Sequence, residues 1–289
     1  MNTISWVLKT SKVRSFETKK DIADLIFLLL HRVEFLSMKL FFRQSGQGAP
    51  LVILHGLFGS SDNWYSLAKT FAAHYTVYLV DQRNHGQSPH SDEFNYKLLT
   101  EDLEEFVKDH DLKDPIILGH SMGGKTAMNF AVKNPALLSK LIVVDIVPKY
   151  YKVHHDVLIR GMKAIPLDSI QSRNDAEKIL TEFEPDMSVR QFLLKNLSRD
   201  ESGFHWKINL PAIDTHLDEI GAGMQYTGQF DKPSLFIKGA QSRYYKPGDE
   251  EDIQKIFTQA EFVTLDTGHW VQAEKPVEFA EAVLNFLGH

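Results

Sequence analysis

From Met38 onward, short apolar runs alternate with longer segments of helical periodicity, and this alternation restricts the possible folds more than any other feature. The strand-like runs are rich in Val, Ile and Leu and occupy 51–54, 76–80, 115–118, 141–144, 233–238 and 261–265. Helical periodicity predicts helices over 64–73, 100–110, 121–133 and 276–287. We therefore expect an α/β fold in which helices cover both faces of a mostly parallel sheet. The loops after the strands then meet at one edge of that sheet.

The alternation is interrupted between two strand-like runs, over residues 148–229. This stretch is helix-prone and rich in charge, and it is far longer than one crossover connection needs. We therefore predict a core of 38–147 and 230–289, with a helical cap inserted at 148–229. The aromatic residues of the cap are either ordinary core residues or the lining of an acyl pocket beneath it. They are Tyr150, Tyr151, His154, His155, Phe204, His205 and Trp206.

Charge and cysteine content exclude several functions. The 289 residues include 32 Lys and Arg and 38 Asp and Glu, giving a net charge of −6 with both signs interspersed. No basic face is therefore expected, and nucleic acid is not a predicted partner. The chain has no Cys, which excludes disulfides, thiolate metal sites and a cysteine nucleophile. This absence fits a reducing compartment and favours the cytoplasm, while the oligomeric state is left open.

Residues 1–37 precede the domain pattern, which begins at Met38. Their apolar run at 25–30 is too short to span a bilayer, so stable membrane insertion is not expected. One interpretation is a dispensable extension. The alternative is a transit peptide, and hence an organelle, because the first twenty residues carry one acid, Glu17, and five bases: Lys9, Lys12, Arg14, Lys19 and Lys20.

The strongest chemical signal is the motif Gly119-His-Ser-Met-Gly123, which follows a predicted strand and precedes a predicted helix. This context is typical of the G-x-S-x-G turn, in which a strained backbone projects the serine hydroxyl into a cleft. The residues two before and two after the serine must be small, as Gly119 and Gly123 are. We therefore predict Ser121 as a nucleophile, with the backbone N–H of Met122 stabilising an oxyanion at the helix start.

A second oxyanion donor is expected in the loop after the run at 51–54. The sequence there is His55-Gly-Leu-Phe-Gly59, and Gly56 would allow the backbone to approach the substrate closely. The N–H of Leu57 is the predicted donor, with that of Phe58 as the second choice. His55 ends a buried strand and is interpreted as a structural hydrogen-bonding residue.

A serine hydroxyl needs a neighbouring base, and His269 is the predicted one among the 13 histidines. It follows Gly268 just beyond the run at 261–265, and it precedes the last helix. The resulting chain order of Ser, acid and His is that of the α/β-hydrolases. His120 must point away from the serine on the turn, and His85 lies in a separate loop, so both are predicted to be structural.

The orienting acid is less obvious. In most α/β-hydrolases it follows the first strand after the cap, but here that slot holds Ala240-Gln-Ser242. Asp145 ends the run at 141–144, beside the strand of Ser121, and we assign it as the acid that fixes the histidine tautomer. Asp266 is the fallback. Three later acids are interpreted as a solvated stretch: Asp249, Glu250 and Asp252.

Four segments together resemble a known family: His55-Gly-Leu-Phe-Gly-Ser-Ser-Asp-Asn63, Asp81-Gln-Arg-Asn-His-Gly-Gln-Ser88, Gly119-His-Ser-Met-Gly-Gly-Lys125 and Gly268-His-Trp-Val-Gln-Ala-Glu-Lys-Pro276. The chain is similar, from about Met38 to its end, to the YbfF-type esterases and the related ABHD11-like hydrolases. Asn84-His85 and Lys125 are unusual variations on the general fold signature and make the resemblance specific. It implies hydrolysis of small-acyl esters and acyl thioesters, with the acid at the position of Asp145.

The predicted reaction is acyl transfer in two steps, in which Ser121 attacks the carbonyl carbon and water then hydrolyses the acyl-enzyme, with His269 as base in both steps. The substrate is a small-molecule ester or thioester with a short to medium acyl group. No metal or organic cofactor is expected, because no metal-ligand spacing is present. Perhydrolysis, C–C bond hydrolysis and lyase chemistry use the same scaffold, and a non-catalytic binding module is a further alternative.

Overall fold

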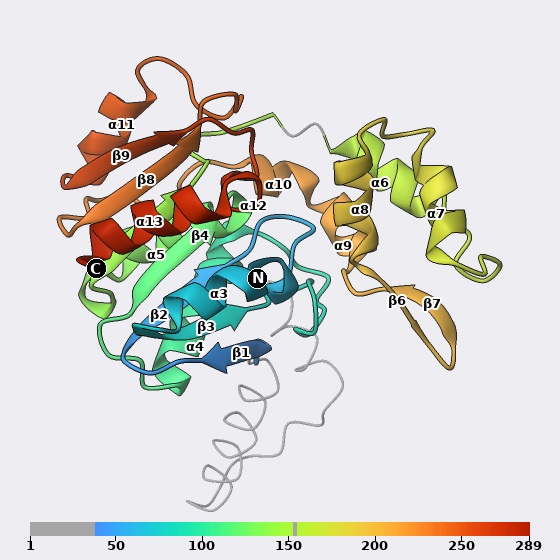
Figure 1. Ribbon diagram of the computed structural model, residues 1–289, viewed down its shortest axis with the longest axis horizontal. Coiled ribbons are helices and arrows are strands. Elements are labelled where there is room, and N and C mark those ends of the chain that lie inside the picture. Colours follow the sequence, from blue (N-terminus) through green and yellow to red (C-terminus); the bar gives the residue numbers. More distant parts are fainter. Residues whose placement is uncertain (1–37, 153–154) are drawn as a thin grey trace, which may run out of the picture. The chain divides into compact units, whose positions relative to one another are not determined.

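The computed structural model describes residues 38–152 and 155–289, and Lys39–His289 forms one compact unit. The predicted extension 1–37 and His154 lie outside the described residues. A seven-stranded sheet has the order β1-β3-β2-β4-β5-β8-β9 (Figure 1). β1 (Phe42–Ser45) pairs antiparallel with β3, and the other neighbours are parallel. The predicted α/β-hydrolase fold, with its mostly parallel sheet, is confirmed.

The six predicted strands are all present, with ends that differ by one or two residues. They are β2 (Ala49–Leu54), β3 (Tyr75–Val80), β4 (Ile116–His120), β5 (Lys140–Val144), β8 (Ser234–Gly239) and β9 (Ala260–Leu265). Successive side chains of a strand point to opposite faces, so a strand covered on both sides is apolar throughout. In β2, Leu51 and Ile53 pack into one core cluster, whereas Val52 and Leu54 are buried outside that cluster.

Helices cover the sheet as the alternation predicts. α3 (Tyr65–Phe71) and α13 (Pro276–Leu287) contribute apolar side chains to the cluster that contains Leu51 and Ile53. α4 (Tyr96–Asp109) and α5 (Met122–Lys133) pack together on the other side of the sheet (Figure 1). Short helices of the core also include η1 (Ser61–Trp64), η2 (Pro135–Leu137) and α12 (Val271–Glu274).

The segment between β5 and β8 is mostly helical and also contains a β-hairpin. Its elements are α6 (Asp156–Lys163), α7 (Arg173–Leu180), α8 (Met187–Leu194), β6 (Leu197–Asp200), β7 (Gly203–Trp206), α9 (Leu210–Thr215) and α10 (Leu217–Gly221). The hairpin is absent from the sequence prediction, because strands of four residues without an apolar run give little periodic signal. Ile159 and Leu193 of this insertion share one apolar cluster with Met122 of the core. No helix in the described part of the chain is long and apolar enough to cross a membrane.

The prediction of a solvated acidic stretch is wrong for Asp249. This stretch forms the first turn of α11 (Asp249–Ile256), where carboxylates interact favourably with the helix dipole. Asp249 is buried, and both of its carboxylate oxygens accept hydrogen bonds from Lys149 Nζ at 2.6 Å. Asp252 is exposed as expected. The ion pair forms across a hundred residues of sequence, so local composition could not reveal it.

Candidate active site

Ser121 lies on a sharp turn between β4 and α5. Its φ of 51° and ψ of −114° place a non-glycine residue in strained backbone geometry. The turn requires small neighbours: a Cβ on Gly119 would lie 2.1 Å from the carbonyl oxygen of Gly123. A Cβ on Gly123 would lie 2.5 Å from the carbonyl oxygen of Leu54. The strained serine therefore depends on backbone packing that only glycine permits at both positions.

Asp145 and His269 meet at the carboxyl edge of the sheet, on the loops that follow β5 and β9. His269 Nδ1 lies 2.7 Å from Asp145 Oδ2, and Asp145 is fully buried. Its φ of 51° turns the chain out of β5. A buried carboxylate at Nδ1 fixes the imidazole tautomer and leaves Nε2 free to act as a base.

Two further groups hold the Asp145 carboxylate. The backbone N–H of Gly239 donates to Oδ1 at 2.9 Å, and the Ser242 hydroxyl donates to Oδ2 at 2.5 Å. Ser242 occupies the slot where most α/β-hydrolases carry the acid, and here it binds an acid that comes from β5. The fallback residue Asp266 is exposed and accepts from Gln241 Nε2 at 2.9 Å, so the structure does not bring it to His269.

Two aromatic rings pack against His269. Tyr244 stacks on its imidazole with a centroid distance of 4.3 Å, and the His120 ring lies 4.7 Å away. His120 Nε2 is 2.9 Å from the His269 carbonyl oxygen. Burial, and then the neighbouring His269, hold the pKa of His120 well below its usual value. A neutral His120 therefore supports the backbone of the histidine loop.

The two predicted oxyanion donors are the backbone N–H groups of Leu57 and Met122, and neither has an acceptor within the described residues. Gly56 allows the loop that contains Leu57 to pass close to Ser121, since a Cβ on Gly56 would lie 3.3 Å from Ser121 Cβ. The N–H of the second choice, Phe58, already has an acceptor, since it donates to His85 Nε2 at 3.2 Å. Leu57 is therefore the better candidate of the two.

Two buried histidines brace this loop. His55 Nδ1 contacts the Gly56 carbonyl oxygen at 2.8 Å, and its Nε2 accepts from the Gln82 N–H at 3.0 Å. Burial, and then the neighbouring His55, lower the pKa of His85 to about 3. His85 is thus neutral near pH 7, and its Nε2 remains an acceptor for the Phe58 N–H. Both histidines have the structural contacts that were predicted for them.

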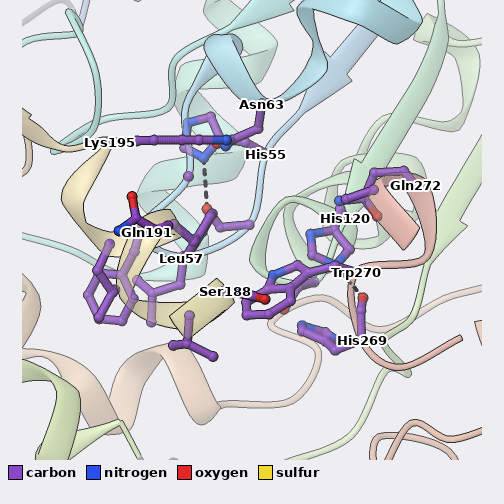
Figure 2. Close-up of a pocket in the computed structure, with 18 of the residues that line it drawn as sticks. His55, Leu57, Asn63, His120, Ser188, Gln191, Lys195, His269, Trp270 and Gln272 are labelled. Atoms are coloured by element: carbon purple, nitrogen blue, oxygen red, sulfur yellow. Dashed lines mark hydrogen bonds between the residues drawn. The ribbon is translucent and has the colours of Figure 1, made fainter. Parts of the chain in front are cut away.

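Two cavities meet at Ser121, and both are lined by Leu57 and His155. The first, here called the α8 cavity, has a volume of about 390 Å³ and is lined by one face of α8 together with His269 and Trp270. In Figure 2, Leu57 and Gln191 lie across this cavity from His120 and His269. Its main apolar side chains are Phe58, Trp64, Leu158, Val189, Phe192, Leu193 and Trp270.

The second cavity has a volume of about 590 Å³ and is here called the cationic cavity. Its lining includes four tyrosines and five basic side chains: Tyr96, Tyr150, Tyr151, Tyr244, Lys125, Lys149, Lys152, Arg243 and Lys246. Three of the cap aromatics proposed for a pocket, Tyr150, Tyr151 and His155, line it. Phe204 and Trp206 instead pack against the apolar cluster of the insertion.

Among the described residues, no group of three or more His, Asp or Glu side chains is arranged to hold a metal ion. The positioning contacts of Ser242 and Tyr244 were not predicted from the sequence. A serine or tyrosine in a loop gives no signal by itself. The recognisable clue was the missing carboxylate after β8, because that gap implies that another group fills the same space.

Comparison with known proteins supports the fold and the class. Residues 49–166 match the family model described as the alpha/beta hydrolase fold. The mouse protein named sn-1-specific diacylglycerol lipase ABHD11 is 39% identical, covering 82% of this chain and 80% of its own length. Escherichia coli esterase YbfF is 34% identical, covering 83% of this chain and 93% of its own length. A solved structure named marine microorganism esterase is 41% identical, with a TM-score of 0.84 over 86% of this chain and 100% of its own.

The chain therefore belongs to the α/β-hydrolase superfamily. Within it, the chain is an ester-cleaving enzyme, since relatives that cover most of its length are named esterases and lipases.

Proposed function

We propose that this enzyme is a serine hydrolase that cleaves carboxylic esters or acyl thioesters through an acyl-enzyme on Ser121. One observation carries the proposal. Ser121, strained at the end of β4, lines the same cavity as His269, whose Nδ1 lies 2.7 Å from the buried carboxylate of Asp145. These are the three groups that nucleophilic acyl transfer by a serine requires.

The proposed reaction begins with attack of Ser121 Oγ on the carbonyl carbon. His269 takes the hydroxyl proton and gives it to the departing alcohol or thiol, and the N–H groups of Leu57 and Met122 stabilise the oxyanion. Water then attacks the acyl-enzyme with His269 again as base. The Ser121 hydroxyl has no hydrogen-bond partner within the described residues, so its bond to His269 belongs to the proposal. Such bonds often form only when the substrate is bound.

The proposed substrates carry short to medium acyl groups, because each of the two cavities at Ser121 is of small-molecule size, at about 390 and 590 Å³. The diacylglycerol lipase names of several relatives make acylglycerols a reasonable addition to the test set. We further propose a core of 38–147 and 230–289 with the cap at 148–229. Cytoplasmic location is retained as a proposal, with an organelle as the alternative.

The decisive experiment compares the wild type with Ser121→Ala on p-nitrophenyl esters from acetate to decanoate, on acyl thioesters and on diacylglycerol. Labelling with a fluorophosphonate probe is measured in parallel. Ser202→Ala is the matched control, because Ser202 lies in the exposed turn of the β6–β7 hairpin and lines neither cavity. Circular dichroism checks that each variant is folded.

Loss of both turnover and labelling in Ser121→Ala alone is the expected result, with a fall in kcat of about 10⁴-fold or more. If folded Ser121→Ala keeps most of its activity, the acyl-enzyme proposal is wrong. A wild type that is folded but neither labelled nor active on any substrate would favour a binding module. Labelling without hydrolysis would favour perhydrolysis, C–C bond hydrolysis or lyase chemistry on the same serine.

A further inference from the structure

The cationic cavity has an unusual charge distribution. Five of its lining residues are Lys or Arg, and no Asp or Glu lines it among the described residues. The positive charge of Lys149 is paired with the carboxylate of Asp249. Arg243 and Lys246 are exposed, and neither side chain forms an ion pair within the described residues. In a chain with a net charge of −6, this concentration of positive charge beside Ser121 is a local feature.

Lys125 is the deepest of these cations. It is buried, and its Nζ donates to the carbonyl oxygens of Gly221 at 3.0 Å and of Ala222. Its Nζ also lies 4.9 Å from the centroid of the Tyr151 ring. Burial lowers the pKa of Lys125 to about 7, and no carboxylate among the described residues offsets its charge there. An anionic ligand in this cavity would supply the missing negative charge.

The position of His269 decides which part of a substrate occupies which cavity. In the proposed reaction, the imidazolium of His269 must give its proton to the leaving alcohol or thiol. His269 lines the α8 cavity and does not line the cationic cavity. Met122, the proposed oxyanion donor, lines only the cationic cavity of the two. The leaving group therefore belongs in the α8 cavity and the acyl group in the cationic cavity.

We propose that the acyl group of the substrate carries a negatively charged carboxylate, as in a monoester or monothioester of an aliphatic dicarboxylic acid, and that Arg243 and Lys246 at the cationic cavity recognise it. This inference rests on the proposed serine hydrolase function. Ser121 Oγ bonds to the carbonyl carbon, the bond to the leaving oxygen or sulfur breaks, and the serine proton passes through His269 to the leaving group. Water then releases the dicarboxylic acid and restores the serine hydroxyl.

The test uses two esters of nearly equal shape, mono-p-nitrophenyl adipate and p-nitrophenyl 6-methylheptanoate. The first ends in a carboxylate and the second in the neutral isopropyl group of similar size. Both release p-nitrophenol, so the ratio of their kcat/KM values, after subtraction of the uncatalysed rates, reports charge recognition alone. We expect the wild type to prefer the adipate by about tenfold, the size of one charge-assisted hydrogen bond.

The variants are Arg243→Gln, Lys246→Gln and the double substitution, each measured by the same ratio. Each single change should lower the preference about two- to fivefold, because exposed cations contribute modestly, and the double change should abolish it. Arg199→Gln is the matched control, since Arg199 is an exposed arginine of β6 that lines neither cavity. The ratio should not change in this variant.

The outcomes separate the two proposals. A wild type that hydrolyses the neutral ester through Ser121 but shows no preference for the adipate overturns the carboxylate inference and leaves the serine hydrolase intact. A preference that survives the double substitution overturns the assignment to this cavity. If neither ester is hydrolysed in a Ser121-dependent way, the proposed function itself fails.

A phosphate on the leaving group is the competing source of negative charge. Butyryl-coenzyme A and the butyryl thioester of N-acetylcysteamine share an acyl group and differ in the phosphates. If the double substitution lowers kcat/KM for the coenzyme A thioester alone and the adipate is not preferred, the cations bind leaving-group phosphate. That result overturns the proposed acyl carboxylate.

Discussion

The sheet core and the inserted segment differ in how they contribute to the site. The core holds Ser121, Asp145 and His269 on turns at the carboxyl ends of β4, β5 and β9, and the first two have the same φ of 51°. The insertion consists of short elements, with helices of five to eight residues, and it supplies cavity walls. The positions of the three proposed catalytic side chains thus depend on the core, whereas the shape offered to the substrate depends on the core and the insertion together.

Hydrogen bonds from asparagine side chains and backbone are among the contacts that join the two regions. Asn196 Nδ2 of the insertion donates to the Phe58 carbonyl oxygen at 2.7 Å, and the Asn209 N–H donates to the Asn84 carbonyl oxygen at 2.9 Å. Asn84 has a φ of 64°, which asparagine tolerates better than most residues. Asn84 therefore anchors the insertion, and His85 braces the loop that contains Leu57 and Phe58.

The largest predicted effect lies in the core. Asp145→Asn should lower kcat by about 10³- to 10⁴-fold on every ester, because an amide favours the wrong tautomer of His269. The measurement is steady-state kinetics on both a small and a large ester, with thermal unfolding as a check of stability. Asp266→Asn is the control, since Asp266 is exposed and contacts Gln241 instead. Near-normal turnover in folded Asp145→Asn would contradict the assignment of the acid.

An intermediate effect concerns Lys125, which joins the core to the carbonyl oxygens at the end of α10. Its pKa in the folded protein is about 7, below the ordinary value of 10.5, so the unfolded chain binds more protons between these values. The free energy of unfolding should therefore rise with pH across this window, by at most about 1.4 kcal/mol per pH unit from this group.

Urea unfolding at about pH 7.5 and about pH 9 measures this rise. Lys125→Met should reduce it, because methionine has no proton to lose. The same substitution at Lys97, which is exposed on α4, should leave the rise unchanged. An equal rise in Lys125→Met and the wild type would show that Lys125 keeps its charge in the folded protein over this range.

The smallest predicted effect lies in the insertion. Phe192 of α8 lines the α8 cavity and packs 5.4 Å from Trp270 between ring centroids. Phe192→Ala should lower kcat/KM for aryl esters relative to ethyl esters by about two- to tenfold, the value of one lost aromatic contact. Phe204→Ala provides the control, since Phe204 lines neither cavity. If Phe192→Ala instead changes the preference for acyl-chain length, the α8 cavity holds the acyl group and the cationic cavity holds the leaving group.

The sequence by itself determined the features that depend mainly on residues close together in the chain. The alternation of apolar runs gave six strands to within two residues, because a strand buried on both faces must be apolar along its length. The Gly119-to-Gly123 motif located the strained serine turn. The need for glycine at 119 follows from a contact four residues away, whereas the need at 123 comes from Leu54 on the neighbouring strand. The choice of Asp145 required only the order of strands and the missing carboxylate after β8.

Only the tertiary structure decided the features that depend on residues far apart in the chain. The Ser242 hydroxyl on Asp145 spans 97 residues, and the buried pair of Lys149 and Asp249 spans 100. His85 accepts the Phe58 N–H, and this contact favours Leu57 over Phe58 as the proposed oxyanion donor. The sorting of the two cavities into apolar and cationic walls arises where the insertion meets the core. These interactions depend on distance in space, which residue order specifies only after the chain has folded.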